Sequence, residues 1–211
     1  FPDRLGEHYR ETITGHRLRR EVIATVLANA MINRGGPAFV VTMMAATSAD
    51  VAAVTSAYAA ARDAFGLTEL NRQIDSLDGE VPGAVQLALY AEVENLLRRQ
   101  TLWFLRNETF EGGLAELVAR HAQGVADIRS GLAGLVSGGI EASIAARAAA
   151  LQAGGAPVEL ARRFAELPAL ALASDVVLVA TRAGSSVPDA AQAFFAVLEA
   201  FGLFGIIDRL K

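Results

Sequence analysis

Apolar residues recur every three or four positions along almost the whole chain, and no other feature of the sequence constrains the fold as strongly. This spacing gathers apolar side chains on one face of an α-helix, whereas the period-two alternation of half-buried strands is scarce. Glycine pairs and single prolines interrupt the pattern, and such residues commonly end and begin helices. The sequence therefore predicts an all-α multi-helix bundle of about ten helices.

Glycine, proline and short polar residues set the expected helix boundaries. Pro2 and Pro82 stand at favoured first-turn positions, and Ser48 with Asp50 is expected to cap a helix that ends at Phe65. Four glycine pairs are interpreted as helix stops, and they begin at positions 35, 112, 138 and 154. The expected helices cover 2–14, 16–34, 38–46, 50–65, 68–77, 82–107, 114–136, 140–153, 157–166, 168–182, 188–201 and 203–210.

Two distant parts of the chain resemble each other. Adding 136 to each residue number from Val40 to Leu67 places Phe65-Gly66-Leu67 on Phe201-Gly202-Leu203, with no gap in the register. An ungapped match of this length favours an internal repeat of about 39–74 and 175–210. We expect the two copies to pack as a pseudo-symmetric pair around the long middle helices.

The composition raises the question of a membrane, because 53% of the residues are hydrophobic and the mean hydropathy is +0.34. The two most apolar windows are interrupted by charge, one by Asp50 and the other by Asp175 and Arg182. Neither window therefore supplies the roughly 20 uninterrupted apolar residues of a transmembrane helix. No membrane partner is expected.

Charge and metal-ligating residues exclude two further classes of function. The net charge of −4 comes with scattered arginines and no basic patch for nucleic acid. The chain has no cysteine, and its three histidines, His8, His16 and His121, lie far apart in sequence, which predicts no metal site. No apolar leader follows Phe1, so a cytoplasmic location is expected.

The most distinctive stretch is HRLRREVIATVLANAMINRGGP, from His16 to Pro37. It resembles the C-terminal region of the large bacterial NAD-specific glutamate dehydrogenases, and AYAAARDAFGL, PGAVQ and SDVVLVATRAGSSVPDAAQAFFAVLEAFGL carry the likeness along the chain. The resemblance implies one all-α C-terminal domain, 1–211, of a longer polypeptide. Phe1 in place of an initiator methionine agrees with this expectation. A division into 1–80, 81–155 and 156–211 is the alternative.

The resemblance also implies where the chemistry occurs. The parent enzyme would oxidise L-glutamate to 2-oxoglutarate and ammonia with NAD, while this region buttresses the upstream catalytic domain and supports homo-oligomer contacts. No Gly-x-Gly-x-x-Gly between a strand and a helix is expected, so the chain is predicted to hold no cofactor. The implied chemistry uses lysines to hold the substrate and to act as a base, yet the only lysine is Lys211. We therefore expect no catalytic residue and no dehydrogenase activity of the chain alone.

The distinctive stretch carries an apolar helical stripe that contains amides. Leu18, Val22, Ile23, Val26 and Ala30 share one side of the expected helix. Thr25, Asn29 and Asn33 fall on or beside this stripe. If the stripe is buried, each amide needs a partner, and the Gly35-Gly36 turn or a neighbouring helix end would supply it. The alternative is that both asparagines face the catalytic portion of the polypeptide.

The basic start of this stretch also has two interpretations. Its arginines could be a solvated helix start balanced by Glu21, or a docking patch for an acidic surface of the catalytic domain. The candidate docking residues are His16, Arg17, Arg19, Arg20, Asn29, Asn33 and Arg34. The alternative function is a regulatory module that senses an amino acid or nucleotide in a pocket between the two repeat copies. That pocket would be lined by Asn29, Asn33 and Arg34.

Overall fold

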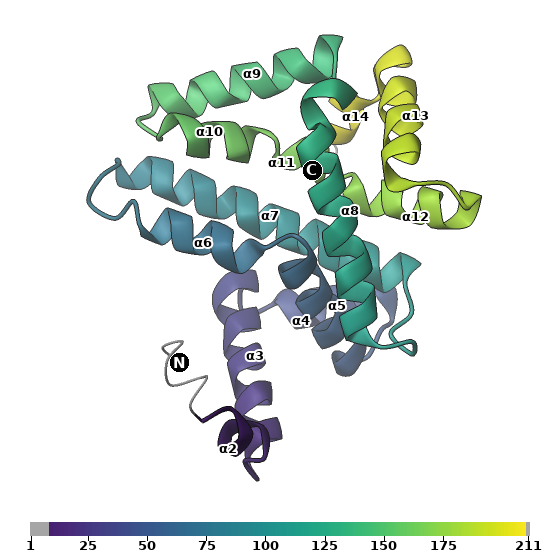
Figure 1. Ribbon diagram of the computed structural model, residues 1–211. Helices are drawn as coiled ribbons and strands as arrows, with labels where there is room; N and C mark the ends of the chain where they lie inside the picture. The colour runs from purple at the N-terminus through teal and green to yellow at the C-terminus, as the bar shows by residue number, and fades with distance from the viewer. Residues whose placement is uncertain (1–8, 210–211) are drawn as a thin grey trace.

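The computed structural model describes residues 9–209, and within them the secondary structure is entirely helical (Figure 1). The first helices are α2 (Arg10–Thr14), α3 (Arg19–Gly35), α4 (Phe39–Thr47), α5 (Val51–Ala64) and α6 (Leu67–Asp75). The middle helices are α7 (Gly83–Asn107), α8 (Leu114–Leu135), α9 (Gly138–Ala153) and α10 (Val158–Ala165). The last are α11 (Leu167–Leu170), α12 (Ala173–Ala183), α13 (Val187–Ala200) and α14 (Phe204–Arg209). The all-α prediction is confirmed, and expected residues 2–8 and 210 lie outside the described part.

The long helices α7 and α8 organise the molecule (Figure 1). Helix α5 packs on both of them, whereas α12 and α13 pack on α8 from the other side. Helices α9 and α10 form a separate antiparallel pair, and Arg147 of α9 reaches Glu92 of α7 in an ion pair of 2.9 Å. Buried side chains from Met31 to Phe204 form one connected hydrophobic cluster between these helices.

Two sequence expectations about boundaries were wrong. The helix expected over 168–182 is broken, since α11 ends at Leu170 and α12 begins at Ala173. The glycine pair at 138 begins a helix instead of ending one, because the backbone N–H of Gly139 donates to the Glu199 carboxylate at 2.7 Å and caps α9. Both differences depend on side chains that are distant in sequence, which local pattern does not reveal.

The repeat hypothesis agrees with the helix boundaries but stays a prediction. Helix α5 ends at Ala64 and α13 at Ala200, which are 136 positions apart. Asp50 and Ser186 cap these two helices, and both copies contain a left-handed glycine, Gly66 with a φ of 63° and Gly202 with a φ of 61°. An ungapped superposition of 39–74 on 175–210 tests it.

Length and composition do not give a membrane span in any single helix of the described 9–209. Two bent pairs, α4 with α5 and α10–α11 with α12, reach that length and composition only when their members are joined. The same part of the chain contains no group of three or more His, Cys, Asp or Glu side chains placed to hold a metal ion.

Replacing Asp175 with asparagine is expected to stabilise the protein at neutral pH. Asp175 is half-buried in the first turn of α12, and its carboxylate accepts a hydrogen bond of 2.7 Å from the Trp103 indole. Burial raises the pKa of Asp175, despite the opposing effects of that hydrogen bond and of the Arg99 charge. Its contribution to stability is therefore present below its unfolded pKa and is lost as the pH rises through the raised folded pKa.

The Asp175→Asn side chain keeps an oxygen that accepts from Trp103 but carries no charge. In thermal unfolding from pH 4 to pH 8, the melting temperature of the variant should therefore rise relative to that of the wild type as the pH increases. Asp175→Leu is the matched control, because it removes both the charge and the acceptor for the indole. A lower melting temperature for Asp175→Asn than for the wild type at pH 8 would contradict the assignment.

Candidate docking helix and the adjacent pocket

Helix α3 projects from the body of the molecule (Figure 1). The apolar stripe that begins at Leu18, just before the helix, is exposed. Leu18, Val22 and Val26 are 45%, 55% and 60% exposed. The opposite face packs on the body through the end of the helix, where Met31 and Gly35 are buried. Of the two interpretations left open for this stripe, burial within the described chain was wrong, because the periodicity located an apolar face without showing what covers it.

The two asparagines of the stripe are exposed as well. Within the described residues neither the Asn29 nor the Asn33 amide makes a side-chain hydrogen bond. In the Gly35-Gly36 turn, which one interpretation gave as a partner for these amides, the Gly35 carbonyl accepts from the Arg98 guanidinium of α7 instead. The interpretation of Asn29 and Asn33 as buried ties within this chain is therefore wrong.

The basic start of the segment lies on the same exposed surface. His16, Arg17, Arg19 and Arg20 are all exposed. The described chain offers these arginines no ion pair, and Glu21 is not within pairing distance of them. The His16 Nδ1 atom accepts from the Leu18 backbone N–H at 3.2 Å, which is a local turn contact.

Substituting Asn29 tests how little this surface contributes to the isolated chain. Asn29→Ala is expected to change the free energy of unfolding by less than about 0.5 kcal/mol, because an exposed side chain without a partner has nothing to lose. Urea denaturation of the 211-residue chain measures it. A destabilisation above about 1 kcal/mol would restore the buried-amide interpretation.

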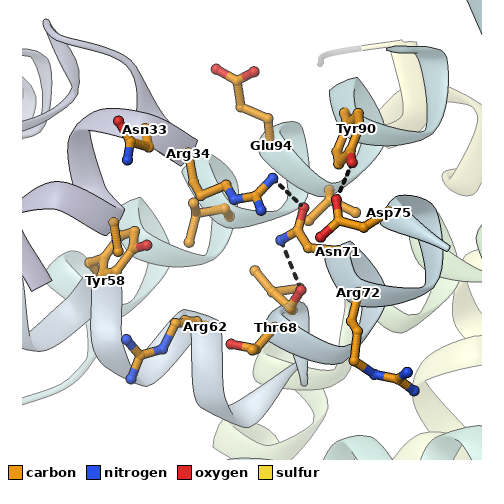
Figure 2. Close-up of a pocket in the computed structure, with 14 residues that line it drawn as sticks. Asn33, Arg34, Tyr58, Arg62, Thr68, Asn71, Arg72, Asp75, Tyr90 and Glu94 are labelled. Carbon is orange, nitrogen blue, oxygen red and sulfur yellow. Dashed lines mark hydrogen bonds between the residues drawn. The ribbon is translucent and has the colours of Figure 1, made fainter. Parts of the chain in front are cut away.

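A pocket of about 500 Å³ lies beside the end of α3, where α3, α5, α6 and α7 meet (Figure 2). Its polar side chains are Asn33, Arg34, Tyr58, Arg62, Thr68, Asn71, Arg72, Asp75, Tyr90 and Glu94. The sequence-based pocket was expected between the repeat copies and was expected to include Asn29. The structure brings Asn33 and Arg34 together but leaves Asn29 out, and all four helices precede the second copy.

Arg34 is held at the mouth of this pocket by neutral groups. One of its guanidinium nitrogens donates to the Asn71 side-chain oxygen at 3.2 Å, while Asn71 itself donates to the Leu67 carbonyl at 2.9 Å. The guanidinium carbon lies 5.7 Å from the centre of the Tyr90 ring, and the Tyr90 hydroxyl donates to Asp75. Arg34 forms no ion pair with any described carboxylate.

The other cations around the pocket are already paired. Arg62 pairs with Asp63 at 2.6 Å, Arg72 with Glu69 at 2.7 Å, and Arg98 with the pocket residue Glu94 at 2.7 Å. The Arg72 guanidinium and the Gln73 amide hold the pKa of Glu69 down to about 2, with the guanidinium bond the larger cause. Among the described arginines around this pocket, Arg34 is therefore the one whose guanidinium has no carboxylate partner.

The buried contacts of His121 were not predicted from the sequence. His121 is fully buried in α8, and its Nε2 atom lies 2.8 Å from Glu108, which also pairs with Arg120 at 2.9 Å. Burial lowers the pKa of His121, against the opposing effect of the Glu108 carboxylate. Its ring packs edge-on against Trp103 and Phe104. A lone histidine in a helical pattern gives no sequence signal for such a contact.

Comparison with known proteins finds a family model and several relatives that match the chain. The family model described as glutamate dehydrogenase, C-terminal, matches residues 1–211. The chain is 34% identical over its full length to an NAD-specific glutamate dehydrogenase of Pseudomonas aeruginosa, and 33% identical over 93% of its length to one of Halomonas elongata. A Mycobacterium tuberculosis protein of the same name is 23% identical over the whole chain.

The chain spans only a small part of these relatives. It covers 13% of the Pseudomonas aeruginosa and Mycobacterium tuberculosis proteins and 12% of the Halomonas elongata protein. The match of the family model over every residue, together with two relatives above 30% identity, decides the classification. The chain belongs to the family of glutamate dehydrogenase C-terminal regions.

Proposed function

We propose that this chain is a non-catalytic helical domain of a longer NAD-dependent glutamate dehydrogenase and that the exposed face of α3 docks on the catalytic part. The observation that carries the proposal is the uncovered stripe of Leu18, Val22 and Val26 in a chain that spans 12–13% of its relatives. Most of each relative lies outside the matching region, so a covering partner within the same polypeptide is available.

The exposed face has the composition of an interface. Helix α3 has 17 residues, which corresponds to a length of about 25 Å. Its valines and leucine would bury apolar area at the centre of the contact, and the amides of Asn29 and Asn33 would find hydrogen-bond partners there. Arg17, Arg19 and Arg20 would lie at one end, where an acidic rim would attract them.

The division of chemistry in the proposal follows from the residues that are missing. The proposed reaction needs one lysine that holds the substrate carboxylate and another, of lowered pKa, that acts as the base. The single lysine of this chain is Lys211, its last residue. The oxidation of L-glutamate with NAD, the catalytic lysines and the NAD site are therefore assigned to the remainder of the polypeptide. Homo-oligomer contacts and a cytoplasmic location are parts of the same proposal.

Charges placed on the stripe test the docking role. Val22→Asp with Val26→Asp in the complete polypeptide is expected to lower NADH formation from L-glutamate by about 10-fold or more, because each charge would be buried without a partner. In the isolated 211-residue chain the same pair should leave the melting temperature within a few degrees of the wild type, since both positions are exposed.

Leu87→Asp is the matched control, because Leu87 is an apolar residue of α7 that is 70% exposed and does not belong to the α3 stripe. It should leave the activity of the complete polypeptide unchanged. Full activity of the double Val→Asp variant would overturn the docking role. NAD-dependent oxidation of glutamate by the isolated chain would overturn the non-catalytic assignment.

A further inference from the structure

Two polar groups of the pocket beside α3, the Arg34 guanidinium and the Tyr58 hydroxyl, keep hydrogen-bonding capacity that the described chain does not use. Arg34 donates to Asn71 and interacts with Tyr90, and the described structure gives it no carboxylate partner. Tyr58 is 1% exposed, yet its hydroxyl makes no hydrogen bond with any described residue. Figure 2 shows the Tyr58 hydroxyl turned towards the space that Arg34 overhangs. This hydroxyl is not among the fully buried unpartnered atoms, so it faces the space of the pocket and is free to bond a ligand there.

Part of the pocket lining is apolar. Leu67, Val93 and Leu97 line it and are 2%, 3% and 3% exposed. Their backbones belong to α6 and α7, whereas Arg34 belongs to α3 and Tyr58 to α5. The volume of about 500 Å³ lies within the range of small-molecule sites, which combine an apolar floor with a few converging polar groups.

We propose that this pocket binds a small monocarboxylate, with its carboxylate on Arg34 and the Tyr58 hydroxyl and its apolar body on Leu67, Val93 and Leu97. The planar guanidinium presents paired N–H donors that match a carboxylate. Tyr58 supplies a third donor, and burial, which raises the pKa of its hydroxyl, keeps that donor protonated. The proposal goes beyond docking, because it needs no catalytic domain.

The carboxylates of the pocket disfavour a ligand with more than one negative charge. Asp75 and Glu94 lie in the same lining, and only Glu94 has a cationic partner, Arg98. A dianion such as inorganic phosphate would face these carboxylates with one free guanidinium to compensate. A single negative charge on an apolar body avoids that repulsion. Such a ligand would also hold α3 against α5, α6 and α7, since Arg34 belongs to α3 and the rest of the proposed contacts belong to the other three helices.

Calorimetric titration of the 211-residue chain with hexanoate tests the site. We expect saturable binding with a dissociation constant of about 1 mM or lower, as suits a ligand of this size. Hexanol, which has the same body without the charge, should bind about 10-fold more weakly, and inorganic phosphate should not compete. L-Leucine tests a zwitterionic ligand. If L-leucine bound more tightly than hexanoate, its ammonium group would lie near Asp75, and the preference for a monocarboxylate would be overturned.

Two variants locate the binding on the proposed groups. Arg34→Gln should weaken hexanoate binding about 10-fold or more, and Tyr58→Phe should weaken it less while keeping the ring contact with Phe39. Arg72→Gln is the matched control, because Arg72 also lines the pocket but pairs with the exposed Glu69. Absence of saturation, or equal affinity of the Arg34→Gln and wild-type chains with unchanged melting temperatures, would overturn the site.

Discussion

Gly124→Ala is expected to destabilise the protein by about 2–3 kcal/mol, although alanine is the better helix former. Gly124 is buried in α8 at its crossing with α12, and a Cβ atom added there would lie 2.2 Å from the Val177 Cγ2 atom. Val177 is 2% exposed and β-branched, so its side chain has little freedom to move aside. The two helices would have to separate, and the surrounding core packing would be lost.

Chemical denaturation of the 211-residue chain measures this effect, and the same helix supplies the control. A Cβ at Gly131 would meet only Leu135, at an ordinary contact distance of 3.7 Å. Gly131→Ala should therefore stabilise the chain by about 0.5–1 kcal/mol. Adding Val177→Ala to Gly124→Ala removes the clash, so the double variant should lose less than the sum of the single losses. Additive losses would show that the contact is not the cause.

Gly124 also shows how far the sequence could predict this fold. The helix over 114–136 was predicted nearly to the residue, and the Asp50 cap of α5 was predicted as well, because both depend on residues close in sequence. A glycine inside a helical pattern shows no preference for a partner helix. Its importance follows from α12, more than 40 positions away, which periodicity does not connect to α8.

For the candidate site too, residues close in sequence were predicted and residues brought together by packing were not. The sequence singled out the exposed stripe of α3 and Arg34, since those residues lie within one short segment. It left open what the stripe faces, because an apolar face has the same pattern whether it meets its own chain or another part of a polypeptide. Tyr58 and Tyr90 reach the pocket from α5 and α7, so only the packing of those helices on α3 reveals them.

The break between α11 and α12 rests on a buried hydrogen-bond network that the sequence did not predict. Gln100 of α7 donates from its amide to the Ala171 carbonyl at 2.7 Å, and its oxygen accepts from the Ser174 hydroxyl at 2.7 Å. Gln100 is 2% exposed, Ala171 4% and Ser174 0%. The carbonyl that the broken helix leaves free is thus satisfied by a side chain from another helix.

Gln100→Leu is expected to cost about 3 kcal/mol or more, although it places an apolar side chain of similar size in an apolar surrounding. The leucine would leave both the Ala171 carbonyl and the Ser174 hydroxyl buried without a partner, at about 1–3 kcal/mol each. Ser174→Ala is the matched control, because it removes one bond and leaves only the Gln100 oxygen unsatisfied, for about 1 kcal/mol. Combining both changes restores part of the loss, since the Ser174 hydroxyl is then absent. Urea denaturation measures these effects. No other described side chain reaches the Ala171 carbonyl, so equal stability of Gln100→Leu and the wild type would mean that helix packing alone causes the break between α11 and α12.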